Sequence, residues 1–192
     1  MHRALKALVV FACALALRGQ APPPQPAAGL ETEWDIGVIL REISAHAGRL
    51  LTLLDRTDAR SWTAKGASET YALQLDSSKQ QAKALETGAL ALAQNPEKLS
   101  QSLELFFRIQ GLETMLGSLE EAMRKYQTPE DAQALASLSA ENGANRERFR
   151  QYIVTLAAER EKQFDVMDRE AQRCRGIMAA QPPAPRPSGR KK

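Results

Sequence analysis

The sequence predicts an all-α protein, an up-and-down helical bundle of four helices whose last helix is overlong, with coiled-coil-like packing. Alanine and leucine dominate the apolar residues, while aromatic residues make up only 5%. Unbranched side chains of this kind lose little rotamer freedom in a helix. Apolar residues also recur at alternating spacings of four and three, which places them on one helix face. The sequence lacks the alternation of apolar and polar residues that a strand would show.

Residues 1–21 have the layout of a secretory signal peptide. A positive start with Arg3 and Lys6 precedes an apolar run, ALVVFACALAL, and small residues follow it. This order is typical of export signals, and the run is too short to anchor stably in a bilayer. We therefore expect cleavage between Ala16 and Ala21, and a secreted or periplasmic mature protein without an integral membrane segment.

Two other interpretations of this segment stay open. It could be a buried N-terminal helix, although the positive start and the proline-rich sequel suit export better. It could also carry a lipid on Cys13. That alternative is disfavoured, because Phe11 is bulky for a lipidation motif and the apolar run continues past the cysteine.

Positive charge gathers at the two ends of the chain. The formal charge is +3, but residues 1–21 hold three basic residues and no acid, and residues 182–192 hold four basic residues. Without both ends, the body has a formal charge near −4. We therefore expect no basic surface on the body that would attract nucleic acid.

Proline sets the expected domain boundaries. Residues 22–31 form a proline-rich linker, and residues 182–192 form a second proline-rich segment with basic charge. Proline lacks the amide donor that a helix interior needs, so we expect both segments to be disordered. Residues 32–181 between them are expected to form a single helical bundle domain.

The first helix is expected from about residue 33 to residue 56. Thr32 and Asp35 are spaced as a capping box at its start. Its core positions follow the four–three rhythm: Ile36, Leu40, Ile43, Ala47, Leu50 and Leu54. A polar loop that contains Trp62 follows at residues 57–67.

The second helix is expected from about residue 69 to residue 94, with Ser68 as its cap. Its stripe has no interruption: Tyr71, Leu75, Ser78, Ala82, Leu85, Ala89 and Leu92. Three heptads of this kind indicate a coiled-coil-like seam. The small residues in the stripe would let a neighbouring helix approach closely.

The third helix is expected to begin at Asn95-Pro96-Glu97 and to reach about Tyr126. Proline suits the first helical position, and an acid suits the positive end of a helix. So short a link after the second helix predicts an antiparallel hairpin. The expected stripe is Leu105, Ile109, Leu112, Leu116, Leu119, Met123 and Tyr126, widened by Leu99, Leu103 and Phe106.

The fourth helix begins with the start signal Thr128-Pro129-Glu130-Asp131, and no further proline occurs before about residue 180. As one helix it would be roughly 75 Å long, against roughly 45 Å for the third. The stripe stays in phase across a polar point near Gly143: Leu135, Leu138, Asn142, Asn145 or Arg146, Phe149, Ile153 and Leu156. We therefore expect one long helix that is soft or kinked near Gly143, with a core asparagine of the kind that fixes register.

The sequence contains no motif that predicts catalysis. It has no glycine-rich phosphate loop, nucleophile elbow or zinc signature. His46, which remains after cleavage, lies one position off the core stripe, and a lone histidine does not complete a metal site. We expect it at the boundary of the core, without a special role. Acids between residues 159 and 170 alternate with basic residues, which predicts a solvated face. We therefore expect no catalytic, metal-binding or cofactor-binding residue, and no enzyme.

Cys174 is alone once Cys13 has been removed with the signal peptide. It lies on the stripe that continues the fourth helix: Arg160, Phe164, Met167, Ala171, Cys174 and Met178. This position favours a small buried side chain. The alternative is an intermolecular disulfide, and Arg173 and Arg175 would favour the reactive thiolate if the side chain is exposed.

The specific function is not readable from the sequence. We expect an exported, non-enzymatic helical bundle that acts as a binding or structural protein of the cell envelope. Because the fourth helix outruns the third, its distal half is the expected interaction surface for a protein partner or a second copy. The candidate residues are Phe164, Met167, Cys174 and Met178. Two alternatives remain, namely a bundle that binds a ligand or haem in an apolar cavity beside the second helix, and an unrecognised hydrolase.

Overall fold

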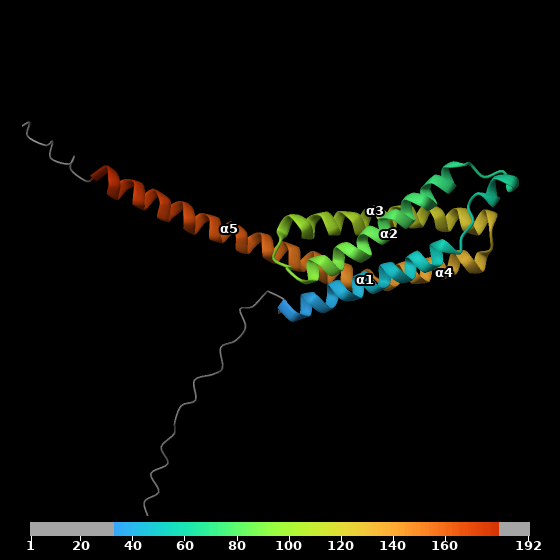
Figure 1. Cartoon of the computed structure of the whole chain (residues 1–192), viewed down its shortest axis with the longest axis horizontal. Helices are drawn as coiled ribbons and strands as arrows, with labels where there is room; N and C mark the ends of the chain where they lie inside the picture. The colour runs from blue at the N-terminus through green and yellow to red at the C-terminus, as the bar shows by residue number, and fades with distance from the viewer. Residues whose placement is uncertain (1–32, 181–192) are drawn as a thin grey trace, which may run out of the picture.

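The computed structural model describes residues 33–180. The expected signal peptide, linker and basic tail lie outside the described residues, as do the side chains of the expected capping box. The described chain folds into helices and turns, without a strand. The elements are α1 (Glu33–Asp55), a 3-10 helix η1 (Ser61–Lys65), α2 (Thr70–Ala93), α3 (Leu99–Tyr126), α4 (Pro129–Glu141) and α5 (Gly143–Ala180). They run up and down in one bundle (Figure 1), which confirms the predicted fold class.

The predicted stripes form the core. Every predicted core residue of α1 is at most 2% exposed, and the stripe of α2 is buried from Leu75 to Leu92. Small residues bring α1 and α2 close together. The Ser44 hydroxyl donates to the Glu86 carbonyl at 2.8 Å, and a Cβ atom added to Gly48 would lie 3.2 Å from Glu86 Oε1. The thin seam predicted from the sequence is therefore a close contact between two helices.

The start of α3 differs from the prediction. The helix begins at Leu99, and Asn95 to Lys98 form the turn. Pro96 is buried in this turn, and its carbonyl accepts a bond from the Ser102 hydroxyl at 3.4 Å. A helix that began at Pro96 would leave too little chain to reverse direction after α2. Leu103, predicted in the stripe, is 37% exposed and lies at its edge.

The fourth predicted helix is interrupted at one residue. Thr128 caps α4, because its side chain accepts a bond from the Asp131 amide at 3.1 Å. Asn142 then separates α4 from α5, and its amide is directed at the Ala140 carbonyl. The helix resumes at once, since the Arg146 amide bonds to the Asn142 carbonyl at 2.9 Å. The soft or kinked point predicted near Gly143 thus corresponds to this one-residue interruption, which we call the kink. The single long helix that the sequence predicted is divided here into α4 and α5.

Replacing Gly111 and Gly117 with alanine is expected to stabilise the bundle by about 0.4–1 kcal/mol per site. Both glycines lie inside α3, and a Cβ atom added to either would meet nothing within 4 Å. Gly66 is the matched control, because its φ of 86° costs other residues about 1–2 kcal/mol. Urea unfolding followed by circular dichroism measures all three. A Gly66→Ala protein as stable as the wild type would contradict this account of the turn.

Candidate functional site

The candidate interaction surface lies on α5, beyond the end of the bundle. The root of α5 is in the core, where Phe149, Tyr152, Ile153 and Leu156 are at most 6% exposed. Arg160 then pairs with Glu97, in the turn between α2 and α3, at 3.0 Å. Every residue from 161 to 180 is exposed, and this segment projects away from the other helices (Figure 1). We call residues 161–180 the arm; at 1.5 Å per residue it is about 30 Å long.

The arm carries all four residues of the predicted surface. Phe164, Met167 and Met178 are 71%, 69% and 73% exposed, and Cys174 is exposed with a free thiol. The expectation that Cys174 is buried is wrong. A stripe position is buried only where another helix covers it, and within the described chain α1, α2 and α3 do not extend along the arm. Val166 and Ile177 are 53% and 57% exposed. Both lie off the stripe, so its periodicity did not predict them.

Apart from Val166 and Ile177, the remaining faces of the arm are polar and solvated, as the charge alternation predicted. Lys162 pairs with Glu159 at 2.7 Å, and Arg173 lies 3.9 Å from Glu170. These exposed pairs within one helix contribute little to stability. No helix in the described part combines the length and the apolar character needed to cross a membrane. The arm is therefore amphipathic, with a narrow apolar stripe between charged faces.

A second feature is polar and lies inside the bundle. His46 is 4% exposed and Asn142 is 3% exposed, so His46 is not the boundary residue that its sequence position suggested. Its Nε2 donates to the Leu138 carbonyl at 2.8 Å. In a regular helix that carbonyl would accept from the Asn142 amide, which is instead directed at Ala140. The imidazole thus bonds to a carbonyl that the kink leaves free.

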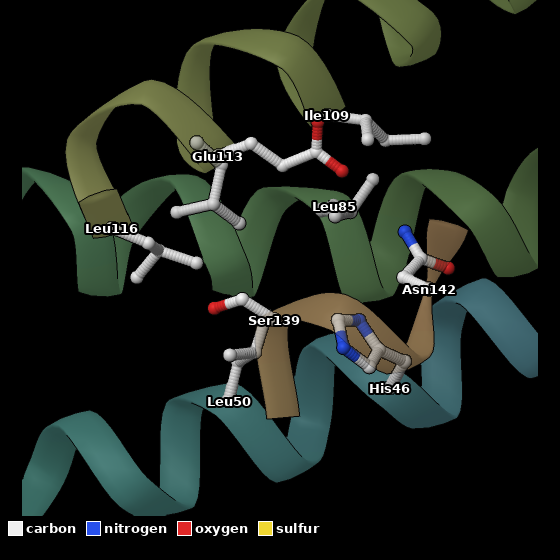
Figure 2. Close-up of a pocket in the computed structure, with 9 residues that line it drawn as sticks. His46, Leu50, Leu85, Ile109, Glu113, Leu116, Ser139 and Asn142 are labelled. Carbon is white, nitrogen blue, oxygen red and sulfur yellow. The ribbon is translucent and has the colours of Figure 1, made fainter. Parts of the chain in front are cut away.

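The kink borders a small cavity of about 10 Å³, which is room for about one water molecule. Figure 2 shows its walls, which come from α1, α2, α3 and the end of α4. Three polar atoms here have no hydrogen-bond partner: His46 Nδ1, Ser139 Oγ and Asn142 Oδ1. Leu85 of α2 lines this space, which is far too small for the haem that one alternative interpretation placed beside that helix.

Ion pairs surround the kink on both sides. Arg49 of α1 donates to Glu141 at 2.7 Å, and Arg146 of α5 pairs with Glu113 of α3. Burial lowers the pKa of His46, and the charge of Arg49 lowers it further. The bond to Leu138 and the charges of Glu141 and Glu113 oppose this shift without reversing it. His46 is therefore neutral near pH 7. The sequence predicted the core position of Asn142 but not the burial of His46 beside it.

An open groove of about 410 Å³ lies between α1 and α4. Arg49 and Arg56 on one side face Asp131 and Glu141 on the other. Charges of both signs along an open groove do not select one class of ligand. Among residues 33–180, no three histidine, cysteine, aspartate or glutamate side chains are grouped as a metal site.

Comparison of the chain with models of protein families, with curated proteins and with solved structures finds no match.

Proposed function

We propose that this protein is a non-enzymatic interaction protein of the cell envelope. Its helical bundle positions the arm, and the arm binds another amphipathic helix. One observation supports the proposal above all: twenty consecutive helical residues are exposed, with Phe164, Met167 and Met178 on one stripe. Exposed apolar stripes of this length usually mark an interface. The envelope location rests on the signal-peptide layout of residues 1–21.

The bundle suits this role because it fixes the root of the arm. Phe149 and Leu156 anchor α5 in the core, and the Arg160–Glu97 pair ties it to the end of the bundle. A rooted helix loses less conformational freedom on binding than a free peptide, which lowers the entropic cost of the complex. The partner is expected to be a helix with its own apolar stripe, because such helices bind through anchors three and four residues apart.

Site-specific photo-cross-linking in cells that make the protein tests this function. We expect p-benzoylphenylalanine in place of Phe164 to give cross-linked protein adducts, because the stripe contacts the partner. The same photoreactive residue in place of Arg169, on the opposite side of the arm, is the matched control and should give few adducts. Mass spectrometry identifies the bound segment. Equal cross-linking from both positions, or none from either, would contradict the proposal.

A further inference from the structure

We infer that the arm binds a second copy of itself, as an antiparallel pair of helices centred between Met167 and Ala171. This inference rests on the proposed function and names the partner. From Phe164 to Met178, every position of the stripe, at alternating spacings of three and four, has an apolar or thiol side chain. Arg160 precedes the stripe at the end nearer the bundle. A partner helix must therefore match a stripe of about this length.

The direction of the stripe decides the orientation of the pair. Met167 follows Phe149 by eighteen residues, and Cys174 follows Leu156 by eighteen residues. Eighteen residues are about five turns of a helix, so the exposed stripe points the same way as the buried root of α5. The stripe therefore faces the space above the end of the bundle. A parallel partner arm would bring its own bundle into the volume that α1, α2 and α3 fill, whereas an antiparallel partner directs its bundle away.

The side chains fit one antiparallel register. When Phe164 lies opposite Cys174 of the second copy, Met167 lies opposite its Ala171. The two-fold symmetry of the pair repeats both of these contacts, with the two copies exchanged. Each layer then joins a large side chain to a small one, which is how facing core positions interdigitate. Met178 lies against the stem of Arg160, where the partner reaches the bundle. The pair thus covers Phe164, Met167 and Met178, the three large apolar side chains of the stripe, which are 71%, 69% and 73% exposed.

The charges that flank the stripe add both attractive and repulsive contacts between the two copies. In this register Glu161 of each copy lies near Arg175 of the other, an attractive pair on both sides of the symmetry axis. Asp168 lies near Asp168 of the second copy and Glu170 near its own mate, which are like-charge contacts. Exposed pairs of either kind amount to about 0–1 kcal/mol, so the apolar layers dominate. The repulsion between the two Asp168 side chains nevertheless distinguishes this register from others.

A shift by one heptad is the strongest competing register. It would pair Asp168 with Arg175 and leave Phe164 outside the apolar contact. The two registers give opposite results for Asp168→Asn. In the register inferred here, this change removes a repulsion and is expected to tighten the dimer about two- to fivefold. In the shifted register, it removes an attraction and weakens the dimer.

Analytical ultracentrifugation across a range of concentrations tests the dimer. The wild type should shift from monomer to dimer, and Phe164→Glu with Met167→Glu should raise the dissociation constant at least about a hundredfold. These side chains are exposed, so thermal unfolding of the isolated monomer should stay unchanged. Arg169→Glu, off the stripe, is the matched control and should dimerise like the wild type. A wild-type monomer at all concentrations overturns the inference. Photo-cross-linking to a different helix would then leave the proposed function standing.

Thiol cross-linking tests the register directly, in a Cys13→Ser background. With Phe164 opposite Cys174, the two Cys174 thiols are about 15 Å apart along the helix axis, and a short bismaleimide should not join them. Phe164→Cys places a second thiol opposite the native Cys174, and the covalent dimer should then form. A covalent dimer through Cys174 alone would overturn the register, as would weaker association of Asp168→Asn.

Discussion

Replacing Trp62 with alanine is expected to lower the free energy of unfolding by about 3–5 kcal/mol. The indole is 1% exposed, although it lies in η1, the short connection between α1 and α2. It packs edge-on against Tyr71, with ring centroids 6.3 Å apart, and Tyr71 in turn contacts Tyr126 at 6.1 Å. Losing the indole leaves a cavity between the connection and the ends of α2 and α3.

The loop around Trp62 has little freedom to collapse into such a cavity. The Asp58 carboxylate accepts bonds from the Arg60 and Ser61 amides at 3.2 and 3.4 Å. At the other side, the Ala67 amide bonds to the Trp62 carbonyl at 3.2 Å. Phe107→Ala is the matched control, because this ring is 63% exposed, and its loss should change stability by no more than about 0.5 kcal/mol. Equal losses in the two variants, measured by urea unfolding, would show that Trp62 is not part of the core.

Periodicity predicted the helices well because burial in a bundle repeats with the helix turn. The stripe of α1, that of α2 from Leu75 to Leu92 and that of α3 from Leu105 to Met123 are buried, as their four–three spacing predicted. Trp62 was assigned to a polar loop because a single aromatic residue has no period. His46 was placed at the boundary for a related reason: its burial depends on Leu138, ninety-two residues away. Contacts that join distant segments once leave no repeating signal in the sequence.

Cys174 shows the reverse error. Its four–three position is real, and the same rhythm that buries Leu156 continues to Met178. Periodicity predicts which face of a helix is apolar, but that face is buried only where neighbouring helices are long enough to cover it. The relative lengths of the helices did predict this outcome, since the last helix outran the third. For the arm, helix length was therefore a better guide to exposure than hydrophobic pattern.

The arm is the distal part of α5, and α5 begins directly after the kink. The stability of the buried cluster around His46 therefore affects how stably the arm is attached to the bundle. His46 joins α1 to the end of α4, and the Arg146–Glu113 pair joins the first turn of α5 to α3. A proton on His46 would place a positive charge on a side chain that is only 4% exposed. Protonation is therefore expected to weaken the bundle at the point from which α5 extends.

The last prediction follows from this cluster: the protein should lose stability as pH falls below about 6.5, and His46→Gln should remove that loss. The pKa of His46 is lowered from 6.5, chiefly by burial. The unfolded chain therefore takes up a proton before the folded chain does, and unfolding becomes easier as pH falls from 6.5 toward the folded-state pKa. The facing charges are Arg49, Glu141 and Glu113, and their net effect leaves this direction unchanged.

Urea unfolding from about pH 7.5 to about pH 5 measures the loss, and glutamine keeps a donor near the position of Nε2 without titrating there. Hydrogen bonds from Gln127 and Thr128 lower the pKa of Asp131, and one from Arg150 lowers that of Glu147. Their stabilising effect is lost only as pH falls below about 4.5, outside this window. The sequence's other histidine, His2, lies in the expected signal peptide, so His46 is the histidine of residues 33–180 that titrates in this window. Because the folded state excludes the proton only if His46 is buried at the kink, parallel slopes for the wild type and His46→Gln would mean that the imidazole is open to water.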